Sequence, residues 1–123
     1  MGRLTIKSGP AEVTLPIVRG DDVDYPIAFY TAYTDETTNT ELDITGRTYS
    51  SSIAATKGGT AVTTATVTVT DAANGKITWS LTDTQTDALT GPRYVWDLIE
   101  NPGTSSERTL IIGLLNMTGR ATA

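Results

Sequence analysis

Acidic side chains gather at the start of the stretch RGDDVDYPIAFY, residues 19–30. Arg19, Gly20 and Asp21 form the tripeptide that adhesion proteins present to integrins. Such a tripeptide occurs often by chance, and adhesion requires it at the tip of an exposed loop. Here it separates two apolar segments, where Gly20 permits a bend and the carboxylates stay in water. We therefore interpret it as a turn between strands.

The same aspartates raise a second possibility, a calcium site. Calcium takes six to eight oxygen ligands, which the loops of a β-sandwich can supply. Asp21, Asp22 and Asp24 would need further carboxylates from a later loop, namely Asp35, Glu36, Glu41 or Asp43. The sequence lacks the ligand spacing of an EF-hand, and a chain with a net charge of −5 has acidic loops in any case. We predict no bound metal, with a calcium-dependent carbohydrate-binding module as an alternative.

Groups for catalysis are few. The chain has no histidine and no cysteine, so it lacks the commonest general base at neutral pH, the commonest zinc ligand and any thiolate nucleophile. Asp97 and Glu100 lie near a predicted strand end, but no helix or cleft pattern frames them as a catalytic pair. The serines at 50–52 have no histidine to activate them, and no glycine-rich phosphate loop precedes a helix. We expect no enzymatic activity and no cofactor.

Charge and hydropathy restrict the partners and the location. A net charge of −5 argues against a nucleic-acid surface, since phosphate contacts need basic residues. The first ten residues, MGRLTIKSGP, lack the apolar run of a signal peptide, and no window has enough apolar residues to span a bilayer. We expect no nucleic-acid or membrane partner, and synthesis in a cytoplasm.

The elements that must position these groups are strands. Threonine makes up about a fifth of the chain, and β-branched residues favour strands. Apolar and polar residues alternate with a period of two in most segments. Strands are predicted in RLTIK, EVTLPIV, YPIAFYTAY, RTYSSSIAAT, TATVTVT, KITWSL, RYVWDLIE and RTLIIGLLNM. Asn74-Gly75 predicts a hairpin, and residues 82–89 predict one short helix that a Thr82–Gln85 capping box begins.

Seven to eight short strands with a turn signal roughly every 8–12 residues predict an all-β, immunoglobulin-like antiparallel β-sandwich with one short helical turn. We expect a single domain over residues 11–123, preceded by an N-terminal arm or edge strand over residues 1–10. Phe29, Trp79 and Trp96 are predicted core residues.

Tyr94 follows a glycine and a short turn, where immunoglobulin-like domains place the tyrosine that closes the corner between their sheets. The alternative is an ordinary core aromatic. Exposed aromatic rings could also stack on sugars, and Tyr30 and Tyr33 are the candidates, although core positions fit the aromatics better.

The last strand is apolar on both faces. Leu110, Ile112 and Leu114 alternate with Ile111 and Leu115, which predicts cover on both sides, either within the domain or by another subunit. We predict protein–protein contacts through the strand at 109–116 and the first ten residues. The expected interface residues are Leu4, Ile6, Leu110, Ile111 and Leu115.

Five segments, in this order, resemble a module common in tailed-phage genomes: RGDDVDYPIAFY, ELDITGRTYSSSI, DAANGKITWSL, TDTQTDALTGPRYVWDLIE and RTLIIGLLNMTGRAT. The matching elements are the Arg-Gly-Asp turn, the Asp-Ile-Thr-Gly element at 43–46, the strand with Tyr94, Trp96 and Asp97, and the Leu-x-x-Gly element at 110–113. Over residues 18–122 the chain is similar to the N-terminal domain of the upper baseplate protein of lactococcal siphophages and to small stand-alone phage virion proteins.

The resemblance implies an immunoglobulin-like sandwich in a virion, without catalysis. The expected role is an adaptor that docks onto the tail or baseplate or attaches fibres, with a trimeric capsid decoration or cement protein as the alternative. The expected partners are other virion proteins and further copies of the chain, assembled in the cytoplasm of a bacterial host. Upper baseplate proteins continue into a linker and a trimeric stalk, whereas this sequence ends at Ala123, so we expect no receptor-binding tip on it.

Overall fold

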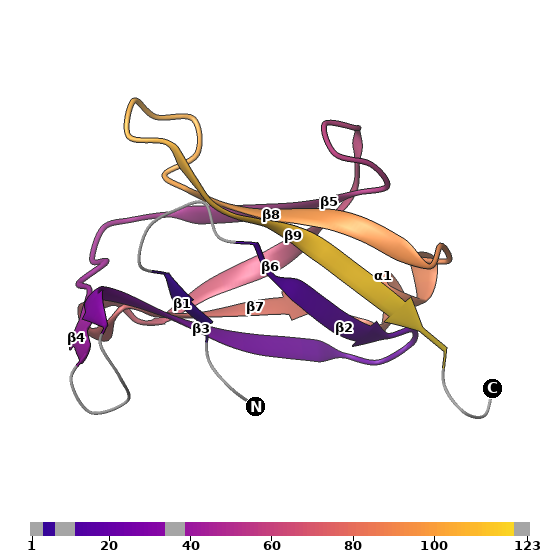
Figure 1. The fold of residues 1–123 in the computed structure, drawn as a ribbon, viewed down its shortest axis with the longest axis horizontal. Helices are drawn as coiled ribbons and strands as arrows, with labels where there is room; N and C mark the ends of the chain where they lie inside the picture. The colour runs from indigo at the N-terminus through magenta and orange to yellow at the C-terminus, as the bar shows by residue number, and fades with distance from the viewer. Residues whose placement is uncertain (1–3, 7–11, 34–38, 120–123) are drawn as a thin grey trace.

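The computed structural model describes residues 4–6, 12–33 and 39–119, and it shows two layers of strands packed face to face (Figure 1). The described residues form nine strands and two short helical segments. In chain order these are β1 (Leu4–Ile6), β2 (Thr14–Val18), β3 (Val23–Tyr33), β4 (Asn39–Glu41), β5 (Tyr49–Ala54), β6 (Ala61–Asp71), the 3-10 turn η1 (Ala72–Asn74), β7 (Lys76–Leu81), α1 (Asp83–Ala88), β8 (Arg93–Glu100) and β9 (Arg108–Thr118).

One long strand joins the two layers. The first sheet has the order β1-β3-β7-β6, with β4 paired to the end of β3, and the second has the order β5-β8-β9-β2. Strand β6 belongs to both, because its first half pairs with β5 and its second half with β7. The sheets are therefore continuous through β6, and β1 and β2 lie at the two ends of the strand order.

This strand order is that of an immunoglobulin-like sandwich, so the predicted all-β sandwich with one short helix is confirmed. Two details differ from the prediction. Strand β4 raises the number of strands to nine, and it lies in a polar stretch without alternation. The pairs β1–β3 and β2–β9 are parallel, so the architecture is mixed rather than purely antiparallel.

The predicted N-terminal arm is described only in part. Residues 4–6 pair with β3 as an edge strand, with Leu4 opposite Ile27 and Ile6 opposite Phe29. The other residues of the predicted arm, 1–3 and 7–10, lie outside the described residues.

Two tryptophans fill the centre between the layers. Trp79 and Trp96 are 0% and 1% exposed, with their ring centroids 5.3 Å apart, and Phe29 is also buried. The Trp79 indole N–H donates to the Ser51 hydroxyl at 2.8 Å, and that of Trp96 donates to the Val13 carbonyl at 3.1 Å. Each ring therefore buries a large apolar surface and also has a partner for its polar nitrogen.

Local signals place the two short helical segments. The Thr82 hydroxyl accepts from the Gln85 N–H, and the Gln85 side chain accepts from the Thr82 N–H, so the predicted capping box begins α1. The predicted Asn74-Gly75 turn joins β6 to β7, but Asn74 is the last residue of η1, and of the two residues only Gly75 has a positive φ, of 68°. A side chain at Gly75 would lie 2.5 Å from the Leu42 carbonyl oxygen, so only glycine fits there.

Candidate functional site

The Arg-Gly-Asp turn is bound to α1 by side-chain and main-chain contacts. The Arg19 guanidinium donates to the carbonyls of Leu89, at 2.9 Å, and Gly91, at 3.2 Å, at the C-terminal end of the helix. The Gly20 N–H donates to the hydroxyl of Thr86 at 3.0 Å, and that hydroxyl lies 2.9 Å from the Asp21 carbonyl, to which it can donate. Thr86 is fully buried. The turn therefore anchors the connection between β2 and β3 to the helix.

The carboxylates considered for calcium have separate local roles. Asp22 accepts from the N–H of Asp83 at 2.7 Å, and Asp24 accepts from the Ser80 hydroxyl at 2.6 Å. Asp43 accepts from the hydroxyl and the N–H of Thr45, and these hydrogen bonds hold the Asp43 pKa below its ordinary value. Within the part of the chain that the structure describes, no three acidic residues converge as metal ligands. Asp35 and Glu36 lie outside the described residues.

Tyr94 lies at the corner between the sheets. Its hydroxyl accepts from the N–H of Gly91 at 2.9 Å, three residues upstream, as in the tyrosine corner of immunoglobulin-like domains. A Cβ on Gly91 would lie 3.1 Å from the same hydroxyl, so a side chain at Gly91 would crowd the tyrosine. Tyr94, Trp96 and Leu98 share one face of β8, as the alternation indicated, and the last two are fully buried.

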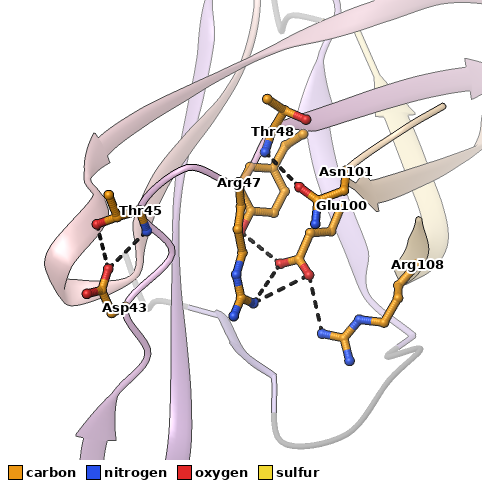
Figure 2. A network of polar contacts seen from close by, with 8 residues as sticks. Asp43, Thr45, Arg47, Thr48, Glu100, Asn101 and Arg108 are labelled. Carbon is orange, nitrogen blue, oxygen red and sulfur yellow. Dashed lines mark hydrogen bonds and ion pairs between the residues drawn. The ribbon is translucent and has the colours of Figure 1, made fainter. Parts of the chain in front are cut away.

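A charged network lies at the far end of β8 (Figure 2). Glu100 is 4% exposed and accepts from the Tyr49 hydroxyl at 2.9 Å. The guanidinium groups of Arg47, at 3.3 Å, and Arg108, at 3.4 Å, approach the same carboxylate. Burial raises the pKa of Tyr49, and the hydrogen bond to Glu100 raises it further. The network joins β5, β8 and β9 and compensates the buried charge, which would otherwise be costly.

The other groups considered for catalysis serve the fold. Asp97 accepts through its side chain from the Ser52 N–H at 2.9 Å, and its carbonyl accepts from the Ser51 hydroxyl. Ser51 is buried and also accepts from Trp79. These contacts tie β5 to β8 and place no hydroxyl beside a general base.

The suggestion of Tyr30 as a sugar platform is wrong, because Tyr30 is only 5% exposed and its ring is not available at the surface. Tyr33 ends β3, and the structure does not describe its side chain. Trp79 and Trp96, the other large rings, lie in the core.

Three residues expected at an interface belong to the core instead. Leu110 is 5% exposed, and Ile111 and Leu115 are fully buried between the sheets. The reason is a register shift: Leu98 pairs with Ile111 but Ile99 with Thr109, so Leu110 is an extra residue in β9. Two neighbouring residues can therefore both be buried, and the alternation assumed from the sequence slips by one. The side chains of Leu4 and Ile6 are not described.

The surface of β9 that remains for contacts is its outer face. Ile112 is half-buried there, and Leu114, beside Val95 of β8, is 38% exposed. Together with Ala54 of β5 and with Pro16 and Val18 of β2, these residues form what we call the outer apolar face: Pro16, Val18, Ala54, Val95, Ile112 and Leu114.

Two shallow grooves lie on this face, and Lys57, Val95 and Ile112 line both of them. One has a volume of about 360 Å³ and reaches toward Asp97, and the other has a volume of about 290 Å³ and reaches Glu12. The alternation in β9 put Ile112 and Leu114 on one face of the strand, but neither was among the expected interface residues, and Val95 and Lys57 were missed as well. The alternation of Val95 with Tyr94 and Trp96 is the signal that could have placed it on the outer side.

Comparisons with known proteins give no family assignment: no family model matches the chain, and no curated protein matches it. No helix within the described ranges is long and apolar enough to cross a membrane.

Proposed function

We propose that this chain is a structural protein of a bacteriophage particle, a non-catalytic adaptor that docks onto the tail or baseplate or attaches fibres. The observation that carries the proposal is that the motifs behind the phage resemblance hold the sandwich together. Arg19 fastens the first turn to α1, Tyr94 closes the sheet corner, and Gly113 lets β2 approach β9. The motifs shared with the phage module therefore stabilise the fold, which suits a structural component better than an enzyme.

The surface chemistry supports the same role. The carboxylates of Asp97 and Glu100 and the hydroxyl of Ser51, all considered for catalysis, are used in hydrogen bonds between strands. The outer apolar face offers a broad, shallow surface, of the kind that contacts another protein. A rigid sandwich with a contact face on one sheet suits an adaptor held between larger components.

A stop codon early in the gene, in the phage that encodes this chain, tests the role. We expect particles with intact, filled heads that adsorb poorly to the host, because the component that connects tail and fibres is missing. Supplying the chain from a plasmid should restore adsorption. As a matched control, a plasmid copy with Trp96→Ala, which leaves a large cavity in the core, should fail to restore it.

Normal adsorption together with heads that lose their DNA on mild heating would contradict the tail role and point to a capsid cement. Particles that are unchanged in infectivity, morphology and composition would contradict any structural role in the virion.

A further inference from the structure

The two outer faces of the sandwich differ in chemistry. On the first sheet the outward side chains of β6 and β7 include Thr66, Thr68 and Thr78, while Val62, 55% exposed, and Val69, 40% exposed, are the exposed large apolar residues of β6. On the second sheet the outer apolar face carries Val95, Ile112 and Leu114 at its centre and Val18, 36% exposed, at its margin. A cluster of apolar side chains at the surface of a small domain can mark a contact site for another protein.

The edge of β2 is poorly suited to a contact through added strands. The Val13 carbonyl and the Arg19 N–H form hydrogen bonds with β9. Main-chain groups alternate in direction along a strand, and Pro16 lies three residues from each of these, so its main-chain groups point away from β9, toward the open edge of the sheet. Proline has no N–H to donate, and its carbonyl already accepts from the Tyr25 hydroxyl at 2.7 Å. A partner is therefore better received on the face of this sheet than at its β2 edge.

The charges around the outer apolar face balance one another. Lys57 and Arg93 are cationic, whereas Glu12 and Asp97 are anionic, and Lys57 and Glu12 line the same groove. The chain as a whole has a net charge of −5, so its acidic excess lies away from these four residues. A second copy presents the same balanced set, and a twofold rotation can bring Lys57 of one copy toward Glu12 of the other.

The size of the face fits a modest interface. Four strands spaced about 4.8 Å apart and about eight residues long cover roughly 500 Å². Specific interfaces at the small end of the range bury less than about 600 Å² per partner, and such contacts are weak or transient. Association in the micromolar range is therefore expected for the isolated chain.

We propose that two copies of this chain pair through their outer apolar faces about a twofold axis, with Leu114 at the centre and Lys57 and Glu12 paired across the axis. This pairing requires no other virion component, so its failure would leave the proposed function standing, and loss of the virion role would leave the pairing standing.

Sedimentation velocity of the purified chain between about 5 and 500 μM tests the pairing. We expect a monomer–dimer equilibrium that Leu114→Asp weakens at least tenfold. Val69→Asp, an equally exposed apolar residue of β6, is the matched control and should leave the equilibrium unchanged. Lys57→Glu and Glu12→Lys should each weaken the dimer, and the double variant should recover most of the loss. Circular dichroism and the melting temperature establish that each variant is folded.

A monomer throughout this concentration range would overturn the proposal. So would a dimer or trimer that Leu114→Asp leaves intact, because another surface would then hold the copies together. Additive losses in the charge-swapped double variant would contradict the pairing of Lys57 with Glu12.

Discussion

At Gly113 the addition of a single methyl group is expected to lower the stability of the fold strongly. A Cβ at this position would lie 1.8 Å from the carbonyl oxygen of Val13 and 2.7 Å from the indole nitrogen of Trp96. The Val13 carbonyl accepts from both the Leu114 N–H and the Trp96 indole. The absence of a side chain at position 113 therefore allows β9 and the start of β2 to approach each other beside Trp96.

Gly113→Ala should lower the free energy of unfolding by about 3 kcal/mol, since the methyl group overpacks the core and separates two hydrogen-bonded partners from the Val13 carbonyl. Gly119→Ala is the matched control, because nothing lies within 4 Å of the position its Cβ would take. Urea unfolding of both variants measures the difference. Equal stability of the two would show that β2 does not pack on β9 as described.

Tyr49 links the stability of the charged network to alkaline pH. Its pKa in the folded protein is raised above the ordinary value of about 10 by burial and by the Glu100 carboxylate. Above pH 10 the unfolded chain therefore loses this proton before the folded chain does, and the free energy of unfolding falls as the pH rises. Below pH 10 the hydroxyl is protonated in both states, and its full contribution to the free energy of unfolding is present.

Tyr49→Phe should therefore destabilise the protein at pH 8, and the difference from the unsubstituted chain should shrink above pH 10. Unfolding by urea at both pH values measures it. The difference between the absorbance titrations of the two proteins isolates Tyr49 among the five tyrosines. A group that titrates near pH 10 in that difference would contradict the buried hydrogen bond to Glu100.

At the scale of elements, the contact between the β2–β3 turn and α1 accounts for the Arg-Gly-Asp sequence. Arg19 donates to the carbonyl of Leu89, the C-cap of α1, where a cation is also favoured by the helix dipole, and to that of Gly91 just beyond it. Thr86 fastens the other end of the turn. The tripeptide is thus explained by the fold without reference to adhesion.

Arg19→Ala should lower the free energy of unfolding by about 2 kcal/mol, because two charge-assisted hydrogen bonds are lost. Arg19→Lys should recover little, since an ammonium group cannot match the guanidinium fork across both carbonyls. Arg93→Ala, at an exposed position of β8, serves as the control and should be neutral. The denaturant concentrations at the midpoint of unfolding measure these differences. An Arg19→Ala variant with an unchanged midpoint would contradict the anchoring of the turn to α1.

Asp22 allows the capping role to be separated from metal binding. Asp22→Asn keeps an oxygen that accepts from the Asp83 N–H, so its stability should remain close to that of the unsubstituted chain. Asp22→Ala should lower the free energy of unfolding by about 1 kcal/mol, which is the usual cost when the N-terminus of a helix loses a hydrogen-bond acceptor. Adding calcium should leave the melting temperature of all three proteins unchanged. A calcium-dependent rise that either substitution abolishes would establish a metal site instead.

Sequence reasoning succeeded for elements whose information is local. The alternation in KITWSL and RYVWDLIE oriented Trp79 and Trp96 correctly, and the Thr82–Gln85 spacing located α1. It failed where the pairing between strands determines which side chains are buried. The extra residue in β9 buries both Leu110 and Ile111, which no periodic pattern in the strand reveals.

At the scale of the whole molecule, the strand order places β2, an early strand, beside β9, the last one. Strand β2 runs parallel to β9, so residues 14–18 and 114–118 share one sheet although almost the whole chain separates them. The candidate contact face spans β2, β5, β8 and β9, and it exists only because of these long-range pairings. The apolar residues of the last strand were visible in the sequence, but their neighbours Val95, Lys57 and Glu12 depend on the topology.

The virion role is tested most directly by counting this chain in purified particles. Quantitative mass spectrometry of phage banded on a density gradient should find it at a constant ratio to the tail proteins in every preparation, including after a high-salt wash. Its absence from such particles, while the chain is abundant in the lysate that produced them, would contradict the proposed function.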